Sequence, residues 1–593
     1  PIPVEKEARE FAEKKFYGAS PKLITVSRLD GRKSHQNILM TIKNLLPKFP
    51  DLKYISVGDG DERSNLEKLK NDKSGESGDF TSDCLKSAPE EFCKILSFLF
   101  RSYLIHGHIS KKLLTCALSP IVKDSNGDIA ASKNYRAIAI SSLILKIFDI
   151  CILLLIGHLL SNDELQYGFQ KNCSTLQCTW AVQETVSHYL RNGSEIFCCL
   201  LDFSKAFDKV NFQKLFLKLM ERKIPFIVLR LLLIIYKNQT CYVKWNSRKS
   251  ASFEVKNGVR QGAILSPTLF CTYLDSLLQK LRESGLGCQL GGSYLGALGY
   301  ADDVILLSPS RESLQAMLKI CQDFSEEHSM QFSADPIQSK SKTKCLHFTT
   351  KKREVSQLIL NGDKLPWVDK ASHLGNTLTT NLSSSPLGMD SSADLLQKRA
   401  IFFQKVHELK QAYGCYNPRL ICEIIRIFGC SFYGSPLWSL RSEEHQKLNR
   451  SWNTVMKIIW DLPYATHNRF LESMSDIPHL QSMLHGRYIG FIDNISSTKK
   501  IHLQMLFNSC KQNQSCNTGQ NIEYLLKLCK VESLNSLIMK KQLIKNGRIY
   551  PLKEGEEWLV EMIEEMCLSK LGFFATDIEE KDINTMLDIV CTE

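Results

Sequence analysis

The 593-residue sequence lacks the cysteine spacing that a zinc ribbon or a disulfide framework requires. Its 21 cysteines are scattered, and no CxxC pair has a matching second half. Cys510 and Cys516 come nearest to a pair, and no set of Cys or His residues follows them. Other cysteines, such as Cys198 and Cys199, stand in apolar runs. We therefore expect free thiols in a reducing compartment, and so an intracellular protein of the nucleus, the cytoplasm or both.

The sequence also lacks a membrane-spanning run and a secretory leader. Its most apolar run, Ile150 to Leu160, is too short to cross a bilayer. The opening Pro-Ile-Pro-Val-Glu-Lys has no signal-peptide pattern, so we expect no membrane association. The missing initial Met predicts a fragment or a processed product.

Composition indicates a folded protein of several domains with a basic surface. The chain is long, and its hydrophobic content of 43% is enough to build cores. The net charge of +12 is spread along the whole length. This excess favours a polyanionic partner, although a dispersed basic excess is also typical of an ordinary solvated surface.

The first seventy residues predict a single βαβ unit. Lys22 to Thr25 and Leu52 to Val57 have strand composition, and an amphipathic helix lies between them. Arg28 and Lys33 precede that helix, where they could grip a diphosphate. The stretch resembles the start of the nucleotide-binding half of a family-4 (GT-B) glycosyltransferase, whose Arg and Lys at these places contact the sugar-nucleotide diphosphate. Because one βαβ unit cannot bury both faces of its sheet, we interpret it as a fused fragment of a Rossmann-like domain.

Two adjacent carboxylates, Asp302 and Asp303, follow a small-residue run and precede the apolar run Val304 to Leu307. The pattern predicts a β-hairpin with its turn at Ala-Asp-Asp. Neighbouring like charges beside a core are costly, so a cation should compensate them, and a divalent metal is the simplest candidate. The alternative is an ordinary polar turn.

A third carboxylate, Asp202, directly follows the apolar strand predicted for Ile196 to Leu201. The end of a buried strand is a common place for a metal ligand, but Asp202 could equally cap a helix that starts near Ser204. Further on, Gly258 to Gly262 reads Gly-Val-Arg-Gln-Gly and leads into a periodic apolar helix. A loop of this kind suits contact with a flat or phosphate-bearing ligand.

The order of these segments is that of motifs A, B and C of a polymerase palm. Together they resemble reverse transcriptases of non-LTR (LINE-type) retrotransposons over about residues 80–378. The residues that carry the resemblance are Asp202 to Asp208 (Asp-Phe-Ser-Lys-Ala-Phe-Asp), Gly258 to Gly262, Tyr300 to Asp303 (Tyr-Ala-Asp-Asp), Asn134 to Arg136 and Ser339 to Phe348.

The resemblance implies an α+β fold of the right-hand polymerase type, with fingers, palm and thumb. We divide the chain into a glycosyltransferase-like fragment (1–70), a polar linker (71–79), fingers and palm (80–380), a helical thumb or connection (381–470) and a helical region without an assigned role (471–593). In the thumb, the stripe of Leu448, Trp452, Val455 and Ile459 is interpreted as core rather than as a base-stacking platform.

The family match also implies a two-metal site for nucleotide addition. Asp202 and Asp302 would bridge two Mg²⁺ ions, with Mn²⁺ as a possible substitute. Asp303 would complete the site, and the carbonyl of Phe203 could be a backbone ligand. Hard oxygen ligands of this type suit these ions and not zinc.

Further residues would bind the substrate, as the same resemblance implies. Arg136, with Lys123 as a weaker candidate, would clamp the triphosphate from a hairpin formed by 118–123 and 134–140. Gln261 would lie near the base pair. Phe207 would exclude a 2′-hydroxyl, unless it is simply a core residue. Lys344 or Lys342 would protonate the leaving pyrophosphate or only balance charge.

The implied partners are an RNA template, a DNA primer and dNTPs, and nothing in the sequence indicates an oligomeric state. No endonuclease or RNase H pattern is evident. Some positions depart from the family pattern, among them Ala137, Asn172 and Cys173. Two alternatives therefore stay open: an inactive relic that only binds nucleic acid, and a glycosyltransferase based on the first seventy residues.

Overall fold

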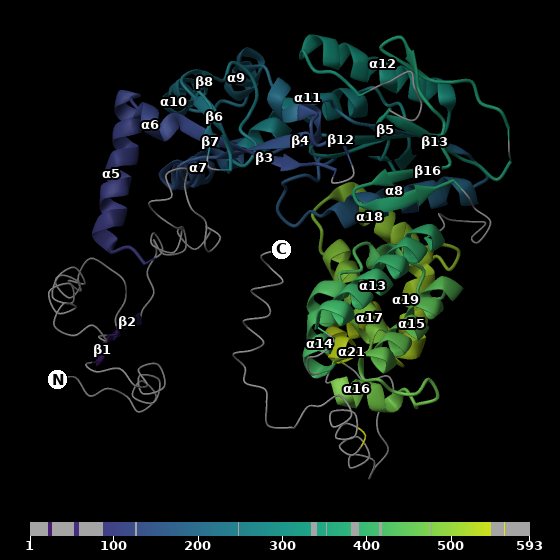
Figure 1. Ribbon diagram of the computed structural model, residues 1–593. Coiled ribbons are helices and arrows are strands. Elements are labelled where there is room, and N and C mark those ends of the chain that lie inside the picture. Colours follow the sequence, from purple (N-terminus) through teal and green to yellow (C-terminus); the bar gives the residue numbers. More distant parts are fainter. Residues whose placement is uncertain are drawn as a thin grey trace. The chain divides into compact units, whose positions relative to one another are not determined.

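The computed structural model describes residues 22–26, 53–57, 87–546 and 563, apart from 125–126, 247, 334–340, 352, 381–390, 414–417 and 476 (Figure 1). The chain divides into two compact units, each built from two separate stretches. Unit 1 comprises Pro1–Asn162 and Lys205–Leu274, and unit 2 comprises Asp163–Ser204 and Asp275–Glu593. Both units contain helices and sheets, which confirms the predicted mixture of α and β structure.

The two strands predicted near the N-terminus are present. β1 (Lys22–Val26) and β2 (Lys53–Val57) pair in parallel, with Lys22 opposite Lys53. The helix predicted between them, Arg28, Lys33 and the predicted linker 71–79 lie outside the described residues. The structure therefore tests only the two strands of the predicted βαβ unit.

Unit 1 is built around a mixed sheet with the strand order β4-β3-β6-β7, and β8 also pairs with β6. β3 and β4 form the predicted antiparallel hairpin, with Val122 opposite Tyr135, and β3 pairs with β6 in parallel. The elements are α5 (Glu90–His106), α6 (Lys111–Leu114), β3 (Thr115–Val122), η1 (Ser132–Asn134), β4 (Tyr135–Ile140), α7 (Leu143–Ile156), η2 (Gly157–Leu159), η3 (Ala206–Lys209), α9 (Phe212–Glu221), α10 (Phe226–Lys237), β6 (Thr240–Trp245), β7 (Arg248–Lys249) and β8 (Phe253–Glu254). The helix α11 (Ser266–Glu283) begins in unit 1 and ends in unit 2.

Unit 2 contains an antiparallel sheet with the strand order β11-β12-β5-β13. Its strands are β5 (Ile196–Leu201), β11 (Ala297–Tyr300), β12 (Asp303–Ser308) and β13 (Lys344–Phe348). Consecutive strand residues point to opposite faces, and Ile196, Phe197, Cys198 and Cys199 are all fully buried, so both faces are covered. The helix α8 (Thr175–Arg191) packs on β5 and β11, and α12 (Arg311–Glu327) packs on β5 and β12.

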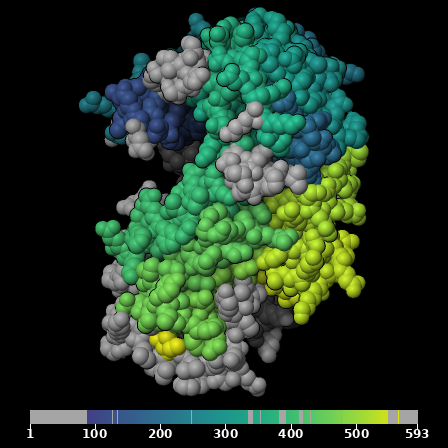
Figure 2. Space-filling model, turned by 90° about the vertical axis from the view of Figure 1, so that its right-hand side faces the viewer, coloured from purple at the N-terminus to yellow at the C-terminus, as the bar shows by residue number. Residues whose placement is uncertain are grey.

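The rest of unit 2 consists of short hairpins followed by helices, which appear green to yellow in Figure 2. The elements are β9 (Gln289–Leu290), β10 (Ser293–Tyr294), β14 (Ile359–Leu360), β15 (Asp363–Lys364), β16 (Lys370–His373), β17 (Asn376–Thr379), α13 (Ser392–Tyr413), α14 (Pro418–Ile424), η4 (Ile425–Gly429), η5 (Ser435–Leu437), α15 (Glu443–Ile459), α16 (Arg469–Ser475), α17 (Leu480–Ser496), α18 (Ile501–Cys510), α19 (Asn517–Leu528), α20 (Leu534–Met539) and α21 (Lys541–Asn546).

The apolar stripe of α15 is core, as predicted. Leu448, Trp452, Val455 and Ile459 are all buried and belong to a cluster that also includes residues of α13, α14, α16 and α17. These side chains therefore hold the helices together and do not present a surface for base stacking. Within the described residues, no helix combines the length and the hydropathy that crossing a bilayer requires.

Candidate active site

The three predicted carboxylates gather at one end of two neighbouring strands. β12 pairs with β5 so that Val304 lies opposite Leu201, and extending this register by one residue sets Asp303 opposite Asp202. Residues opposite one another in an antiparallel pair have Cβ atoms roughly 4.5–5.5 Å apart. The strand register therefore brings together carboxylates that are a hundred residues apart in the sequence.

The hairpin turn consists of Ala301 and Asp302, because Tyr300 ends β11 and pairs with Asp303, the first residue of β12. Ala301 has a φ of +56°, in the left-handed region that residues with a Cβ adopt at a cost. Asp302 is partly buried, and Asp303 is exposed. A strained residue thus directly precedes the first of the two carboxylates.

Asp202 is held in place by backbone contacts. Its N–H donates to Thr343 Oγ1 at 3.4 Å, and its carbonyl accepts a hydrogen bond of 2.7 Å from the N–H of Ser333. Next to it, the ring of Phe203 packs on that of Phe332 with a centroid distance of 4.3 Å. The strand end that presents Asp202 is therefore held by contacts from Phe332, Ser333 and Thr343.

The electrostatic environment of Asp202 favours a cation. Its side chain is 29% exposed, and partial burial raises the pKa of the carboxyl, an effect that Lys342 opposes. The Nζ of Lys342 lies 3.7 Å from Asp202 Oδ2. Lys344 stands on β13 opposite Leu200. Of the two lysines considered from the sequence, Lys342 is thus the one that lies beside Asp202.

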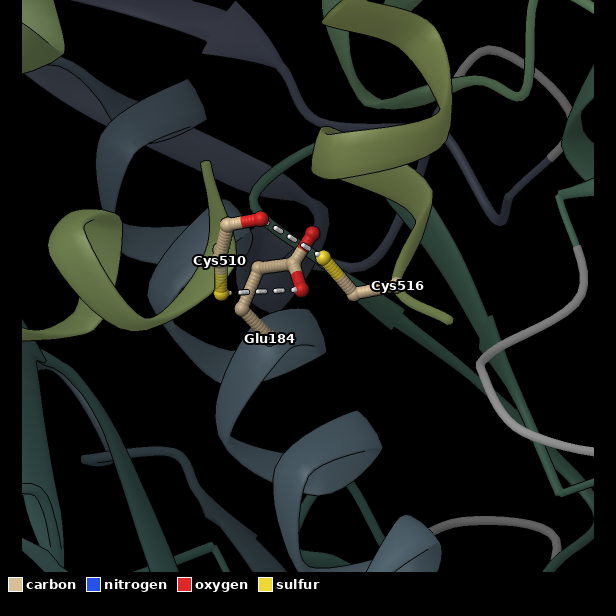
Figure 3. Close-up of side chains that lie close together, drawn as sticks. All are labelled: Glu184, Cys510 and Cys516. Atoms are coloured by element: carbon tan, nitrogen blue, oxygen red, sulfur yellow. Dashed lines mark hydrogen bonds between the residues drawn. The ribbon is translucent and has the colours of Figure 1, made fainter. Parts of the chain in front are cut away.

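The donor set fits a hard divalent cation, because three carboxylates share one end of the sheet and carboxylate oxygens are the ligands that Mg²⁺ and Mn²⁺ prefer. Across the described residues, the set of three whose ligand atoms all lie within 4.8 Å of one another does not include these aspartates but consists of Glu184, Cys510 and Cys516 (Figure 3). The aspartates are spaced more widely, as expected of three like charges that repel one another.

Unit 1 carries four of the five predicted substrate-binding residues, and the fifth, Lys344, lies on β13 of unit 2. Arg136 lies on β4 opposite Ile121 of β3, and its side chain is exposed. Lys123 follows β3, and its N–H donates to the carbonyl of Asn134 at 2.8 Å. Both basic side chains therefore stand on one hairpin, as predicted, and both are accessible.

The Gly-Val-Arg-Gln-Gly loop is fastened to two neighbours within unit 1. The N–H of Val259 donates to the carbonyl of Phe207 at 2.8 Å, and the carbonyl of Gln261 accepts from the N–H of Ala139 on β4 at 2.7 Å. A Cβ on Gly262, whose φ is +106°, would lie 2.8 Å from the carbonyl oxygen of Ala139, so only glycine permits this approach. Gln261 therefore lies on this loop, and Phe207 lies on a segment that is hydrogen-bonded to the loop.

Phe207 is half-buried, and its ring stacks on that of Phe270, with centroids 4.5 Å apart and planes at 15°. The ring therefore has a packing role in addition to any role in nucleotide selection. Both interpretations made from the sequence remain compatible with this position.

Sequence reasoning missed Gln166, which interacts directly with the hairpin turn. Its Oε1 accepts hydrogen bonds of 2.8 Å from the N–H groups of Ala301 and Gly168. On either side, Tyr167 N–H donates to the carbonyl of Gly299 at 2.7 Å, and Gly299 N–H donates to the carbonyl of Leu165 at 2.9 Å. The partners lie about 135 residues apart in the chain, so no local pattern marks the interaction.

Comparisons with known proteins agree with this arrangement. Residues 121–375 match the profile of the family described as reverse transcriptase (RNA-dependent DNA polymerase). The matched part of the chain is therefore similar to reverse transcriptases, and it includes Asp202, the Gly-Val-Arg-Gln-Gly loop and the Asp302-Asp303 turn.

Curated relatives include proteins of non-LTR retrotransposons. The chain is 27% identical over 264 residues to the Pol polyprotein of type-1 element R2 from Nasonia vitripennis, covering 44% of this chain and 24% of that protein. It is 26% identical over 349 residues to the probable RNA-directed DNA polymerase of the X-element from Drosophila melanogaster (57% and 37%). It is 22% identical over 417 residues to the RNA-directed DNA polymerase of jockey from Drosophila funebris (67% and 43%). The chain thus spans less than half the length of each of these relatives.

Among solved structures, apo telomerase from Candida tropicalis shows 13% identity and a TM-score of 0.33, covering 80% of this chain and 73% of that one. Telomerase from Candida albicans, in complex with a fragment of telomeric RNA, shows 12% identity and the same TM-score of 0.33, covering 74% and 68%. These likenesses are too weak to carry an argument about this chain.

Proposed function

We propose that the chain is an RNA-directed DNA polymerase of a non-LTR (LINE-type) retrotransposon, which adds dNTPs to the 3′-hydroxyl of a primer. One observation carries the proposal: within the part of the chain that matches the reverse transcriptase profile, Asp202 and the Asp302-Asp303 turn lie at the same end of two paired strands. The net charge of +12 agrees with nucleic acid as the partner.

Asp202, Asp302 and Asp303 would hold Mg²⁺, or Mn²⁺ in its place, with the carbonyl of Phe203 as a further ligand. The bound ions would neutralise the charge that develops on the attacking and leaving oxygens. The protein's part would be to hold these carboxylates in position before the substrate arrives. The hydrogen bonds that the Asp202 backbone donates to Thr343 and accepts from Ser333 would serve this purpose. Lys342, beside Asp202, would balance charge or protonate the leaving pyrophosphate, and Lys344 is the second candidate for this step.

The nucleotide would be bound by residues of unit 1. Arg136, and Lys123 as a weaker partner, would pair with the triphosphate, because guanidinium and ammonium groups both bind phosphate oxygens. Gln261 would lie near the base pair, and the ring of Phe207 would exclude a 2′-hydroxyl. The partners would be an RNA template, a DNA primer and dNTPs, in the nucleus or the cytoplasm.

For the rest of the chain we keep the division made from the sequence, with fingers and palm at 80–380 and a helical thumb or connection at 381–470. We also propose that residues 1–70 are a glycosyltransferase-like fragment. The parallel pairing of β1 with β2 supports this, because adjacent parallel strands are what a βαβ unit contains.

Primer extension on an RNA template with Mg²⁺ and dNTPs tests the proposed function. We expect incorporation by the wild type, and a loss of ~10³-fold or more in Asp202→Asn and Asp302→Asn, because several kcal/mol of charge stabilisation disappear. Asp323→Asn, which alters an exposed carboxylate on α12, is the matched control and should keep full activity. A folded wild type that binds the RNA–DNA duplex but incorporates nothing would overturn the proposal in favour of an inactive relic.

A further inference from the structure

A largely buried loop, Glu164 to Gly168, is hydrogen-bonded to the hairpin turn that carries Asp302. The side chain of Gln166 is fully buried, and it receives the N–H of Ala301, the residue directly before Asp302. The backbone of Leu165 and Tyr167 brackets Gly299 on β11 with two further hydrogen bonds. Any displacement of this loop would therefore move the turn as well.

The turn depends on these hydrogen bonds because its backbone conformation is unfavourable by itself. Ala301 has a φ of +56°, and strained residues of this kind persist where the surroundings hold them. The loop approaches so closely that a Cβ on Gly168 would lie 2.3 Å from the nitrogen of Ala301. The contact therefore depends on glycine at 168 and on the loop staying where it is.

The helix α18 and the residue before it also contact this loop. Lys500 Nζ donates to the carbonyls of Glu164 and Gln166, the latter at 3.0 Å, and it lies 4.6 Å from the centre of the Tyr167 ring. His502, which is fully buried, places Nε2 2.6 Å from the hydroxyl of Tyr167. Its Nδ1 lies 3.4 Å from the carboxylate of Glu164. Two residues of the C-terminal region thus contact two carbonyls, a hydroxyl and a carboxylate of the loop.

A second cluster of side chains anchors the C-terminal region around α18 and α19 to α8, the helix that packs on the sheet of unit 2. Glu184 Oε2 accepts from Cys510 Sγ at 3.4 Å (Figure 3). Its Oε1 accepts from the N–H and the hydroxyl of Thr518 at 3.2 and 2.5 Å. Cys516 Sγ donates to the carbonyl of Cys510 and accepts from Gly519 N–H, both within 3.3 Å. Although three side chains of metal-binding types meet here, each already has hydrogen-bond partners within the protein, so we assign the cluster to anchoring.

Other contacts along α8 repeat the pattern. Trp180 Nε1 donates to Thr518 Oγ1 at 2.9 Å, and Gln177 Nε2 donates to Asn494 Oδ1 at 3.0 Å. In Figure 2 the yellow surface of the C-terminal helices continues from the blue surface of the segment that contains α8. The C-terminal helices are therefore fixed to α8, the helix that also packs on the strands of the sheet.

We infer that α18 and α19 position the polymerase site: Lys500 and His502 fix the loop Glu164–Gly168, and Gln166 in turn fixes the turn that presents Asp302 and Asp303. This rests on the proposed function and gives a role to part of the region after residue 470. Lys500, His502 and Gln166 are positioning residues, because they act on the carboxylates only through the backbone of the turn.

Four variants test the inference: Lys500→Met, Tyr167→Phe, Gln166→Met and the control Lys499→Met. The control removes an equal charge from the neighbouring, exposed lysine. In primer extension we expect the first three to raise the Mg²⁺ concentration for half-maximal rate, or to lower kcat, by about 10- to 100-fold, as loss of supporting contacts to metal ligands does. KM for the template–primer should stay unchanged, and Lys500→Arg should recover most of the loss because it keeps the charge and the donors.

Hydrogen exchange of residues 299–303 gives a readout that does not depend on activity. The amide of Ala301, which donates to Gln166, should exchange faster in the three variants than in the wild type and in Lys499→Met. If the wild type fails to extend primers, the proposed function is wrong, and hydrogen exchange still decides whether the C-terminal helices hold the turn. A fall in melting temperature without a change in Mg²⁺ requirement or in exchange at 299–303 would overturn the inference, as would variants that match Lys499→Met.

Discussion

The ammonium of Lys342 lies 3.7 Å from the carboxylate of Asp202, and Lys344, two residues further on, is paired within β13 opposite Leu200. The two lysines looked equivalent in the sequence, but only one of them reaches the carboxylate. The difference arises because Lys342 lies just before the strand, and Lys344 within it.

This difference predicts an asymmetric effect of pH. Burial raises the pKa of Asp202 and Lys342 lowers it, so Lys342→Met should raise that pKa further. A carboxyl that holds its proton to a higher pH binds a divalent cation less well below neutrality. We therefore expect the acid limb of Mg²⁺-dependent primer extension to move to higher pH in Lys342→Met. Lys344→Met is the matched control, and identical profiles for the two variants would contradict the prediction.

Substitution of Phe207 should affect both the discrimination between dNTPs and rNTPs and the stability of the fold, and the two effects can be measured separately. If its ring excludes the 2′-hydroxyl, Phe207→Val should raise the rate of rNTP relative to dNTP incorporation by about 10- to 200-fold, the range of steric discrimination between similar substrates. The variant also loses the stacking on Phe270 and should melt at a lower temperature. Phe212→Val removes another half-buried ring, which packs on Tyr236, and should lower stability alone. Unchanged discrimination in Phe207→Val would leave Phe207 with a packing role only.

Two buried side chains of opposite charge, Asp149 and Arg260, interact electrostatically at the Gly-Val-Arg-Gln-Gly loop. Asp149 is 2% exposed and Arg260 is 7% exposed. Burial raises the pKa of Asp149, and Arg260 and the N–H groups of Leu265 and Ile264 oppose that rise. Removing either partner alone leaves an uncompensated buried charge, a change that costs ~3–5 kcal/mol.

We therefore expect Arg260→Met to lower the free energy of unfolding of the domain strongly, and Asp149→Asn to do the same. In the double variant neither charge remains, so its loss should be clearly smaller than the sum of the single losses. Denaturant unfolding of all four proteins, read as a double-mutant cycle, measures this coupling. Additive losses would show that the two side chains act independently.

Much of the candidate active site could be predicted from the sequence because its strands are marked locally. Continuous apolar runs fixed the strands that end at Asp202 and begin after Asp302, and the two-residue alternation of strands limited where their carboxylates can point. The structure adds the register that sets Asp202 opposite Asp303. It also narrows the turn to Ala301 and Asp302, with Asp303 already in β12.

The supporting contacts could not be predicted, because they join residues far apart in the chain. Gln166 and Ala301 are about 135 residues apart, and Glu184 and Thr518 about 334. Glu184 is charged and flanked by the polar Gln183 and Thr185, so its local sequence does not mark it as buried, yet it is 3% exposed. Long-range burial of a polar side chain leaves no periodic signal, so only the folded structure reveals these partners.

Three buried histidines should make the stability of the C-terminal helices depend on pH in the acid range. His445, His479 and His485 are at most 3% exposed. The rings of His445 and His485 stack 6.4 Å apart, and His479 Nε2 lies 3.0 Å from Asn453 Oδ1. Burial lowers the pKa of His445 and His479 to about 4 and that of His485 to about 3.

Because these folded-state values lie below ~6.5, the usual pKa of an unfolded histidine, the unfolded chain binds more protons in acid. The histidine contribution to stability is therefore fully present above ~pH 6.5 and is lost as the pH falls toward 4. We expect the melting temperature to drop steeply over that interval. His485→Phe, which keeps a ring against Tyr524, should make the drop shallower because one protonation site is gone. His467→Phe, which alters an exposed histidine, should leave the drop unchanged, and an equal effect of both variants would show that the buried cluster is not its cause.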